Sequence, residues 1–510
     1  MLFKTFSAAV FGIDAYLVEV EVDVAQAYEG YFTVVGLPDV AVKESRERIR
    51  SALRNCGFDF PSNHAVTVNL APADIRKEGS AFDLPMALGV AGCQGTFFGK
   101  ILDSYVFLGE LSLDGSVRSV RGALSAALAA RERGIKNVVV PEANAREAAV
   151  VEGIQVFGVK SLPQAVDLIN APESFHPTRV DTSQMLAEAG QYAVDLRDVR
   201  GQMSAKRALE VSCAGSHNIL LIGPPGAGKT MLAKRIPTIL PPMSLDEAIE
   251  TTRIHSVAGV LEDSRGLVGT RPFRSPHHTI SDAGLIGGGA MPRPGEVSLG
   301  HNGVVFLDEL PEFQRAVLES LRQPIETGEA VVARANAHVR YPARFQLVAA
   351  MNPCKCGYAS EPARACGRAP KCAADYQARI SGPLLDRIDI QIDVASVSAQ
   401  DLALPPPAEG SATVASRVAN ARNIQRARYE GLNLRTNAEA EGELLERIAT
   451  PEPGAARLLT DAAERMRLTA RGYHRVLRVA RTIADLAGID TIGRVHIAEA
   501  LSYRRMAHLQ

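Results

Sequence analysis

Residues 218–230 read Asn-Ile-Leu-Leu-Ile-Gly-Pro-Pro-Gly-Ala-Gly-Lys-Thr, an apolar run that leads straight into a glycine-rich loop. A short apolar run bounded by such a loop is typical of a buried strand. The loop fits the phosphate-binding pattern, whose residues here are Gly223, Pro224, Pro225, Gly226, Ala227, Gly228, Lys229 and Thr230. Its glycines let backbone N–H groups point at a phosphate, Lys229 can reach the β- and γ-phosphates, and the Thr230 hydroxyl can hold Mg²⁺. We therefore expect a nucleoside triphosphate to bind here, although the loop alone leaves kinase, transporter and GTPase open.

A second motif narrows the chemistry. Residues 304–309 read Val-Val-Phe-Leu-Asp-Glu, an apolar strand that ends in two adjacent carboxylates. In this arrangement one acid, here Asp308, holds the metal, and the next, Glu309, activates water. The pair therefore favours an ATPase that hydrolyses its nucleotide over a kinase that transfers phosphate.

The length and composition set limits on the fold and the location. A chain of 510 residues is too long for one core, so two or three domains are expected. Hydrophobic residues make up 46% and charged residues 22%, as in ordinary globular proteins, and no apolar stretch has the length of a membrane span. Lys4 is the one basic residue of a start that lacks the layout of a secretory signal, so we expect a cytoplasmic protein without membrane contact. A formal net charge of −1 neither supports nor excludes DNA binding.

The pattern along the chain predicts three domains. Residues 1–170 begin with a valine-rich alternating strand and indicate an α+β domain. Residues 171–194 lose this periodicity and are expected to be a linker. Residues 195–395 have the strand, loop and helix order of a nucleotide-binding parallel sheet, and residues 396–510 are expected to form a helical lid.

The seven cysteines are unevenly placed. An odd number in a cytoplasmic chain does not indicate a disulfide framework. Within an insert at 354–372, however, Cys354, Cys356, Cys366 and Cys372 lie close together. Four thiolates so near to each other can form a tetrahedral zinc site that would rigidify the loop after Asn352. Four reduced thiols without a metal are the alternative.

Further motifs in the same order along the chain resemble a known family. They are Arg-Pro-Phe-Arg-Ser-Pro-His-His at 271–278, Ala-Met-Asn-Pro at 350–353, Gly-Pro-Leu-Leu-Asp-Arg-Ile-Asp at 382–389 and Arg-Val-Ala-Arg-Thr-Ile-Ala-Asp at 478–485. Together with the two motifs above, they resemble the magnesium-chelatase-like branch of AAA+ ATPases and, within it, the bacterial ComM/YifB proteins. The resemblance implies ATP and Mg²⁺ as cofactors and a homo-oligomeric ring, expected to be a hexamer.

The resemblance also implies roles for single residues. Asn352 is similar to the polar sensor that orients the attacking water, although a turn asparagine before Pro353 is the alternative. Arg387 is similar to the arginine finger that reaches into the neighbouring subunit's site. Arg471 resembles the second sensor arginine, with Arg475 as its competitor, and a surface salt bridge is the alternative for both.

The N-terminal domain resembles the S5-type fold (ribosomal S5 domain 2-like) of Lon proteases. Lon enzymes cut peptides with a serine and a lysine, and Ser80 is placed as the serine would be. The position of the catalytic lysine, however, holds Leu124. Without an amine to accept the serine proton, peptide cleavage lacks its base, so we interpret residues 1–170 as a binding or assembly platform.

The resemblance favours an ATP-driven ring that promotes branch migration of DNA during natural transformation. Its substrate would be branched DNA with single- or double-stranded arms, and recombination proteins would be its partners. A magnesium-chelatase-like motor that remodels a protein partner is one alternative, and an ATP-dependent switch that binds a protein is another. A protease is disfavoured by Leu124.

Overall fold

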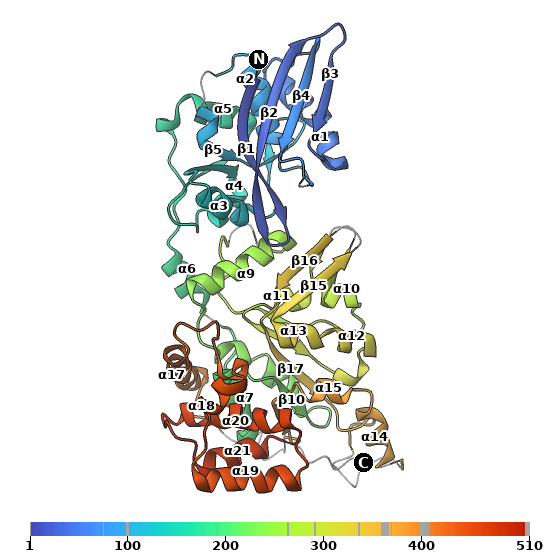
Figure 1. Cartoon of the computed structure of the whole chain (residues 1–510), viewed down its shortest axis with the longest axis vertical. Helices are drawn as coiled ribbons and strands as arrows, with labels where there is room; N and C mark the ends of the chain where they lie inside the picture. Colours follow the sequence, from blue (N-terminus) through green and yellow to red (C-terminus); the bar gives the residue numbers. More distant parts are fainter. Residues whose placement is uncertain are drawn as a thin grey trace. The chain divides into compact units, whose positions relative to one another are not determined.

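The computed structural model describes residues 2–74, 76–97, 101–190, 192–262, 265–289, 292–334, 337–358, 367–368, 370–397, 403, 405 and 407–504, without the side chains of Ile101, Arg334 and Ala337. The chain forms two compact units, residues 1–189 with 244–269, and residues 190–243 with 270–510 (Figure 1). We call them the N-terminal unit and the ATPase unit. Among the described residues, no helix is long and apolar enough to cross a membrane.

The N-terminal unit is built on a seven-stranded mixed sheet in the order β3-β4-β2-β1-β5-β8-β9. Its strands are β1 (Leu2–Phe11), β2 (Asp14–Gln26), β3 (Tyr31–Val35), β4 (His64–Ala71), β5 (Tyr105–Phe107), β8 (Asn137–Pro141) and β9 (Gln155–Val159), with a separate pair, β6 (Glu110–Leu111) and β7 (Val117–Arg118). Its helices are α1 (Val40–Asn55), α2 (Asp83–Cys93), η1 (Ile101–Ser104), α3 (Ala123–Glu132), α4 (Glu142–Ala148), α5 (Leu162–Asn170), η2 (Pro172–Ser174), α6 (Thr182–Ala189) and α9 (Leu245–Ala258). The valines of β2 alternate as predicted, because Val18, Val20 and Val22 are fully buried.

The helix α9 belongs to the N-terminal unit although its sequence lies within the range expected for the ATPase core. Ser256 of α9 accepts a hydrogen bond from the Gly122 N–H and donates one to the buried Glu147 carboxylate. Arg253 pairs with Asp14. Sequence patterns do not show these long-range contacts. The expected linker, residues 171–194, contains η2 and α6, and neither has a buried residue.

The ATPase unit is built on a five-stranded parallel sheet in the order β11-β14-β17-β10-β18. Its strands are β10 (Ile219–Ile222), β11 (Phe273–Arg274), β14 (Val304–Leu307), β17 (Gln346–Met351) and β18 (Ile390–Asp393), with two hairpins, β12 (Gly287–Gly288) and β13 (Arg293–Pro294), β15 (Glu329–Arg334) and β16 (Ala337–Pro342). Its helices before the lid are η3 (Leu196–Asp198), α7 (Met203–Gly215), α8 (Lys229–Ala233), η4 (Ile236–Thr238), α10 (Asp282–Leu285), α11 (Glu296–Leu299), η5 (Leu310–Glu312), α12 (Arg315–Ser320), α13 (Arg322–Thr327), α14 (Lys371–Gln377) and α15 (Gly382–Leu385). The strands β10, β14 and β17 are fully buried, as their unbroken apolar runs predict.

The C-terminal part of the ATPase unit is helical (Figure 1). Its helices are α17 (Ser411–Arg428), η6 (Asn437–Glu439), α18 (Gly442–Ile448), α19 (Pro453–Arg465), α20 (Ala470–Leu486) and α21 (Arg494–Ser502). Apolar residues of α17 and α20 belong to the same core cluster as those of β10 and α7. The predicted fold class, an α+β N-terminal part, an α/β core with a parallel sheet and a helical C-terminal region, is confirmed.

Candidate functional site

The phosphate-binding loop follows β10 and runs into α8. Gly226 and Gly228 have backbone φ angles of +79° and +85°, in the left-handed region that glycine adopts without strain. The ammonium group of Lys229 donates hydrogen bonds to the carbonyl oxygens of Gly223, at 2.7 Å, and of Pro224, at 2.9 Å. Burial lowers the pKa of Lys229, and the nearby Asp308 and Glu309 oppose this effect. The lysine is therefore held inside the loop that it is expected to serve.

The acidic pair lies at the end of β14, where the two carboxylates have different surroundings. Asp308 accepts a hydrogen bond from the Thr230 hydroxyl at 2.6 Å. Glu309 has a φ of +54° and an exposed side chain, with one carboxylate oxygen 3.4 Å from Nδ1 of His278. A hydroxyl and a carboxylate are the hard oxygen ligands that suit Mg²⁺, so Thr230 and Asp308 fit the metal. His278 lies in the motif at 271–278, but its position beside Glu309 was not predicted from the sequence.

Asn352 follows β17, the strand that lies between β10 and β14 in the sheet. Its side-chain oxygen accepts a hydrogen bond from the Lys229 ammonium at 3.0 Å. The carboxyl ends of three adjacent parallel strands thus bring Lys229, Asp308 and Asn352 to the same edge. Ligands bind at this edge in open parallel sheets, because the loops that leave the strands meet there.

The two expected arginines lie apart from this group of residues. Arg387 is 5% exposed, donates to the Pro383 carbonyl at 2.6 Å and pairs with Glu326. Arg471 lies in the first turn of α20 with an exposed side chain, and among the described residues it has no hydrogen bond. Its competitor Arg475 donates to Asp389. Within one chain, therefore, none of these arginines makes a hydrogen bond to the phosphate-binding loop.

Asp389, which sequence reasoning did not single out, is a buried ionised group. Burial by itself would raise its pKa, but Arg475 and His217 outweigh this effect and hold the pKa well below the usual range. The carboxylate also accepts a hydrogen bond from the Asn218 N–H at 3.3 Å, next to β10. Its partners come from segments far apart in the sequence, and they fix helix α20 to the base of the phosphate-binding strand.

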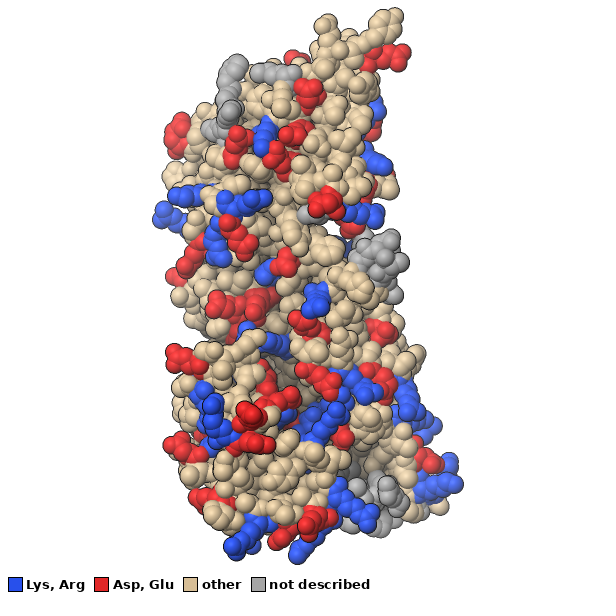
Figure 2. Space-filling view, viewed as in Figure 1, with Lys and Arg blue, Asp and Glu red and all other residues tan. Residues whose placement is uncertain are grey.

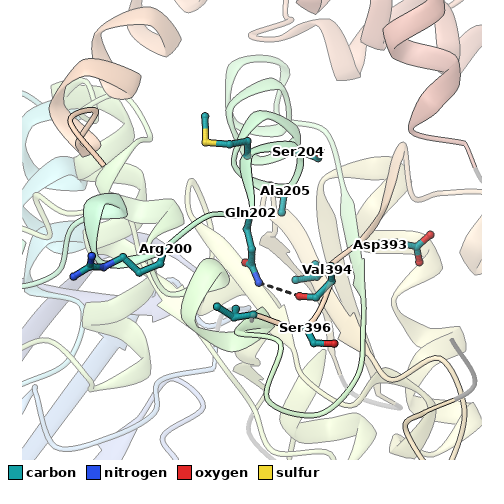
Figure 3. A pocket seen from close by; sticks show the side chains of 10 residues that line it. Arg200, Gln202, Ser204, Ala205, Asp393, Val394 and Ser396 are labelled. Carbon is teal, nitrogen blue, oxygen red and sulfur yellow. Dashed lines mark hydrogen bonds between the residues drawn. The ribbon is translucent and has the colours of Figure 1, made fainter. Parts of the chain in front are cut away.

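A pocket of about 160 Å³ lies next to the phosphate-binding loop (Figure 3). It is lined by Arg200, Gln202, Met203, Ser204, Ala205, Asp393, Val394, Ala395, Ser396 and Val397. Gln202 has a φ of +51°, and its amide donates to the Ala227 carbonyl of the loop, at 2.5 Å, and to the Ala395 carbonyl, at 3.3 Å. Sequence reasoning missed Gln202, because its contact with the loop spans 25 residues and has no motif.

Three of the four clustered cysteines come together. The sulfur atoms of Cys354, Cys356 and Cys372 lie within 4.8 Å of one another, with 2.9 Å between the first two. Cys354 is buried, and the other two are half-buried. Cys366 lies outside the described residues. Among the described residues, these cysteines form the one group of three or more His, Cys, Asp or Glu side chains whose ligand atoms lie close enough together to hold a single metal ion.

The surroundings of Ser80, the candidate protease serine, differ from those of a serine paired with a lysine. The Ser80 hydroxyl is bonded to Glu110, and Leu124 is fully buried in α3. Lys77, three residues before Ser80, is also fully buried and donates to the Pro72 carbonyl. In the described hydrogen bonds, Ser80 therefore has a carboxylate rather than an amine as its side-chain partner.

Comparison with known proteins places these features in a family. The magnesium chelatase subunit ChlI model matches residues 195–402, a further ChlI model matches residues 20–144, and the ChlI C-terminal model matches residues 408–504. The competence protein ComM of Haemophilus influenzae is 42% identical over 99% of this chain and 97% of its own length. The YifB protein of Escherichia coli is 41% identical over 98% of this chain and 96% of its own. The magnesium-chelatase 38 kDa subunit of Rhodobacter capsulatus is 23% identical over 60% of this chain and 85% of its own. The chain therefore belongs to the ComM/YifB family of magnesium-chelatase-like AAA+ ATPases.

Proposed function

We propose that this protein is a ring-forming motor that hydrolyses ATP and drives branch migration of DNA. The observation that carries the proposal is the meeting of Lys229, Thr230, Asp308 and Asn352 at the ends of three adjacent strands. AAA+ membership supports ATP and Mg²⁺ as its cofactors. The name of the relative ComM, a competence protein, supports DNA as the substrate.

In this mechanism the phosphate-binding loop and Lys229 hold the β- and γ-phosphates. Thr230 and Asp308 would hold Mg²⁺, which neutralises charge on the phosphate oxygens when it is bound. Glu309 accepts a proton from the attacking water, Asn352 orients that water, and His278 orients the Glu309 carboxylate. The pocket beside Gln202, next to the phosphate-binding loop, is the proposed site for the base of the nucleotide.

Each active site would be completed by a residue from the neighbouring subunit. Arg387 would leave its own chain's Glu326 and stabilise charge on the transferring phosphate of the neighbouring subunit. Arg471, exposed at the start of α20, would contact the nucleotide when the lid closes. We propose a hexameric ring for this reason, with residues 195–395 as its motor, residues 396–510 as the lid, residues 171–194 as linker and residues 1–170 as a platform for assembly or for recombination proteins.

The proposed substrate is branched DNA, on which the protein would act in the cytoplasm during natural transformation. The hairpin of β15 and β16 projects one candidate for contact with the phosphate backbone, since the Arg340 side chain is 76% exposed. We also propose that the cysteine cluster, with Cys366, holds a structural Zn²⁺.

The first test is ATP hydrolysis by the purified protein, with and without a mobile Holliday junction, with strand exchange measured in the same reaction. Lys229→Ala is the inactive control, and Lys234→Ala, an exposed lysine one turn further along, is its matched control. Stimulated turnover with ATP-dependent conversion of the junction to duplex products is expected. Turnover that no DNA changes would overturn the DNA proposal.

A second candidate is a motor that remodels a protein partner, as in magnesium chelatase. The matches to ChlI models over most of the chain favour it. In this case ATP turnover would remain unchanged with any DNA, and a protein partner would stimulate it instead.

A further inference from the structure

The thiol cluster begins just after β17, the strand whose end carries Asn352. Asn352, Pro353 and Cys354 are consecutive, so the residue proposed to orient water is two positions from a metal-ligating sulfur. Resting on the proposed function, we infer that Zn²⁺ bound by Cys354, Cys356 and Cys372 controls ATP hydrolysis by fixing Asn352 and the phosphate-binding loop in place. The metal would thus act on turnover rather than on folding alone.

The geometry of the three sulfur atoms fits zinc. A Zn–S distance of about 2.3 Å in a tetrahedral site places sulfur atoms about 3.8 Å apart. The separations here start at 2.9 Å for Cys354 and Cys356 and stay within 4.8 Å, so small side-chain rotations suffice. Cys354 is completely buried, so a metal ion bound to it would be shielded from water on that side.

One route from the cluster to the nucleotide site runs through the backbone turn at 354–357. The Gly357 N–H donates to the Cys354 carbonyl at 3.0 Å, which closes a turn that carries both Cys354 and Cys356. Gly357 has a φ of +88°, and a Cβ added to it would lie 2.5 Å from Cδ of Pro225. The backbone of the cysteine turn therefore packs directly on the phosphate-binding loop.

A second route runs through Asn352 and helix α14. The Asn352 side chain is bonded to Lys229, and the Pro353 carbonyl accepts a hydrogen bond from Gln377 at 2.9 Å. Gln377 and Cys372 are both residues of α14. A metal that joins Cys372 to Cys354 and Cys356 would therefore fasten α14 to the end of β17 at a second point. Loss of the metal would leave the Gln377–Pro353 hydrogen bond as the described link between α14 and the end of β17.

The experiment uses the full-length protein and four variants. Cys372→Ser removes one ligand, and Cys93→Ser, a half-buried cysteine of the N-terminal unit, is its matched control. Gly357→Ala breaks the contact with Pro225 and leaves the ligands intact. Gly431→Ala is the control for that change, because Gly431 also has a positive φ, of +78°, but has no neighbour within 4 Å of an added Cβ. Metal content, ATP turnover and amide hydrogen exchange of the segments 223–230 and 352–357 are measured for each.

We expect one zinc ion per chain in the wild type, in both glycine variants and in Cys93→Ser, and none in Cys372→Ser. Turnover should fall about tenfold in Cys372→Ser and in Gly357→Ala, as for other residues that support a site from behind. Hydrogen exchange at 223–230 should rise in both. Wild type without zinc, or Cys372→Ser with unchanged exchange at 223–230, would overturn the inference. Absence of ATP turnover in the wild type would instead contradict the proposed function, because the metal content and exchange remain measurable.

Discussion

The two units place similar polar residues in different settings. In the N-terminal unit, Asp83 is fully buried and bound at both oxygens by Arg48. In the ATPase unit, Lys229 donates a hydrogen bond to Asn352 and lies near Asp308 at the open edge of a sheet. Asp83 has its ion-pair partner in its own chain, and we call polar groups of this type structural. Lys229, Asp308 and Asn352 face the loops where a ligand binds, and we call polar groups of this type functional. Figure 2 shows that charged side chains of both signs are spread over the visible surface, so charge alone does not reveal this difference.

The largest effect is expected at Arg387 of the ATPase unit. Because an arginine finger stabilises the transferring phosphate, Arg387→Ala should reduce ATP turnover about 1000-fold. The free energy of unfolding should fall by only about 1 kcal/mol, because the buried side chain loses its hydrogen bond to the Pro383 carbonyl while its ion pair with the half-exposed Glu326 contributes little. Mixing this variant with Lys229→Ala should restore part of the activity if the site is shared between subunits. A much larger loss of stability, together with the loss of activity, would show that Arg387 is a structural polar group.

Asp389 tests this comparison within the ATPase unit, because it is a structural polar group whose charged partners lie in its own chain. Asp389→Asn should lower the free energy of unfolding by about 4 kcal/mol at pH 7, because Arg475 and His217 lose their buried counter-charge. The pKa of Asp389 is depressed in the folded state, so its stabilisation is present above about pH 4 and is lost as the pH falls toward the folded pKa. Urea unfolding should show the difference between wild type and variant shrinking below about pH 4. A constant difference across that range would contradict the ion-pair explanation.

Asp83 is the counterpart in the N-terminal unit. Asp83→Asn should lower the free energy of unfolding of this unit by about 3 kcal/mol, because the Arg48 guanidinium loses its carboxylate partner. ATP turnover at a temperature where the variant is folded should stay within about twofold of wild type. Differential scanning calorimetry and phosphate release measure the two quantities. A large loss of ATP turnover in a folded variant would show that Asp83 of the N-terminal unit contributes to ATP hydrolysis as well as to stability.

The smallest effect is expected at Ser80. Ser80→Ala removes one hydrogen bond to Glu110 and should cost about 1 kcal/mol of stability. Neither the wild type nor this variant should degrade casein, because the position at which the Lon resemblance predicts the lysine base holds Leu124. Casein degradation by the wild type that Ser80→Ala abolishes would place chemistry in the N-terminal unit as well.

Much of the site was predictable because its parts are local motifs. The glycines, Lys229 and Thr230 are consecutive, and Asp308 and Glu309 follow an apolar strand at once. The partners of these residues were harder to predict from the sequence. His278 lies in the motif at 271–278, but the motif does not show what this histidine contacts, and Gln202 belongs to no motif. Only the packing shows the partner of each.

The sequence by itself predicted a nucleoside triphosphate site, since the phosphate-binding pattern needs only the residues at 223–230 and the strand before them. The tertiary structure decided which distant residues join that loop. Asn352 reaches Lys229 across 123 positions, and Cys372 of α14 lies beside Cys354 of the turn after β17. It also decided that α9 belongs to the N-terminal unit. The physical reason is that a local motif fixes backbone conformation, whereas a contact between distant segments depends on strand order and on the burial of every element between them.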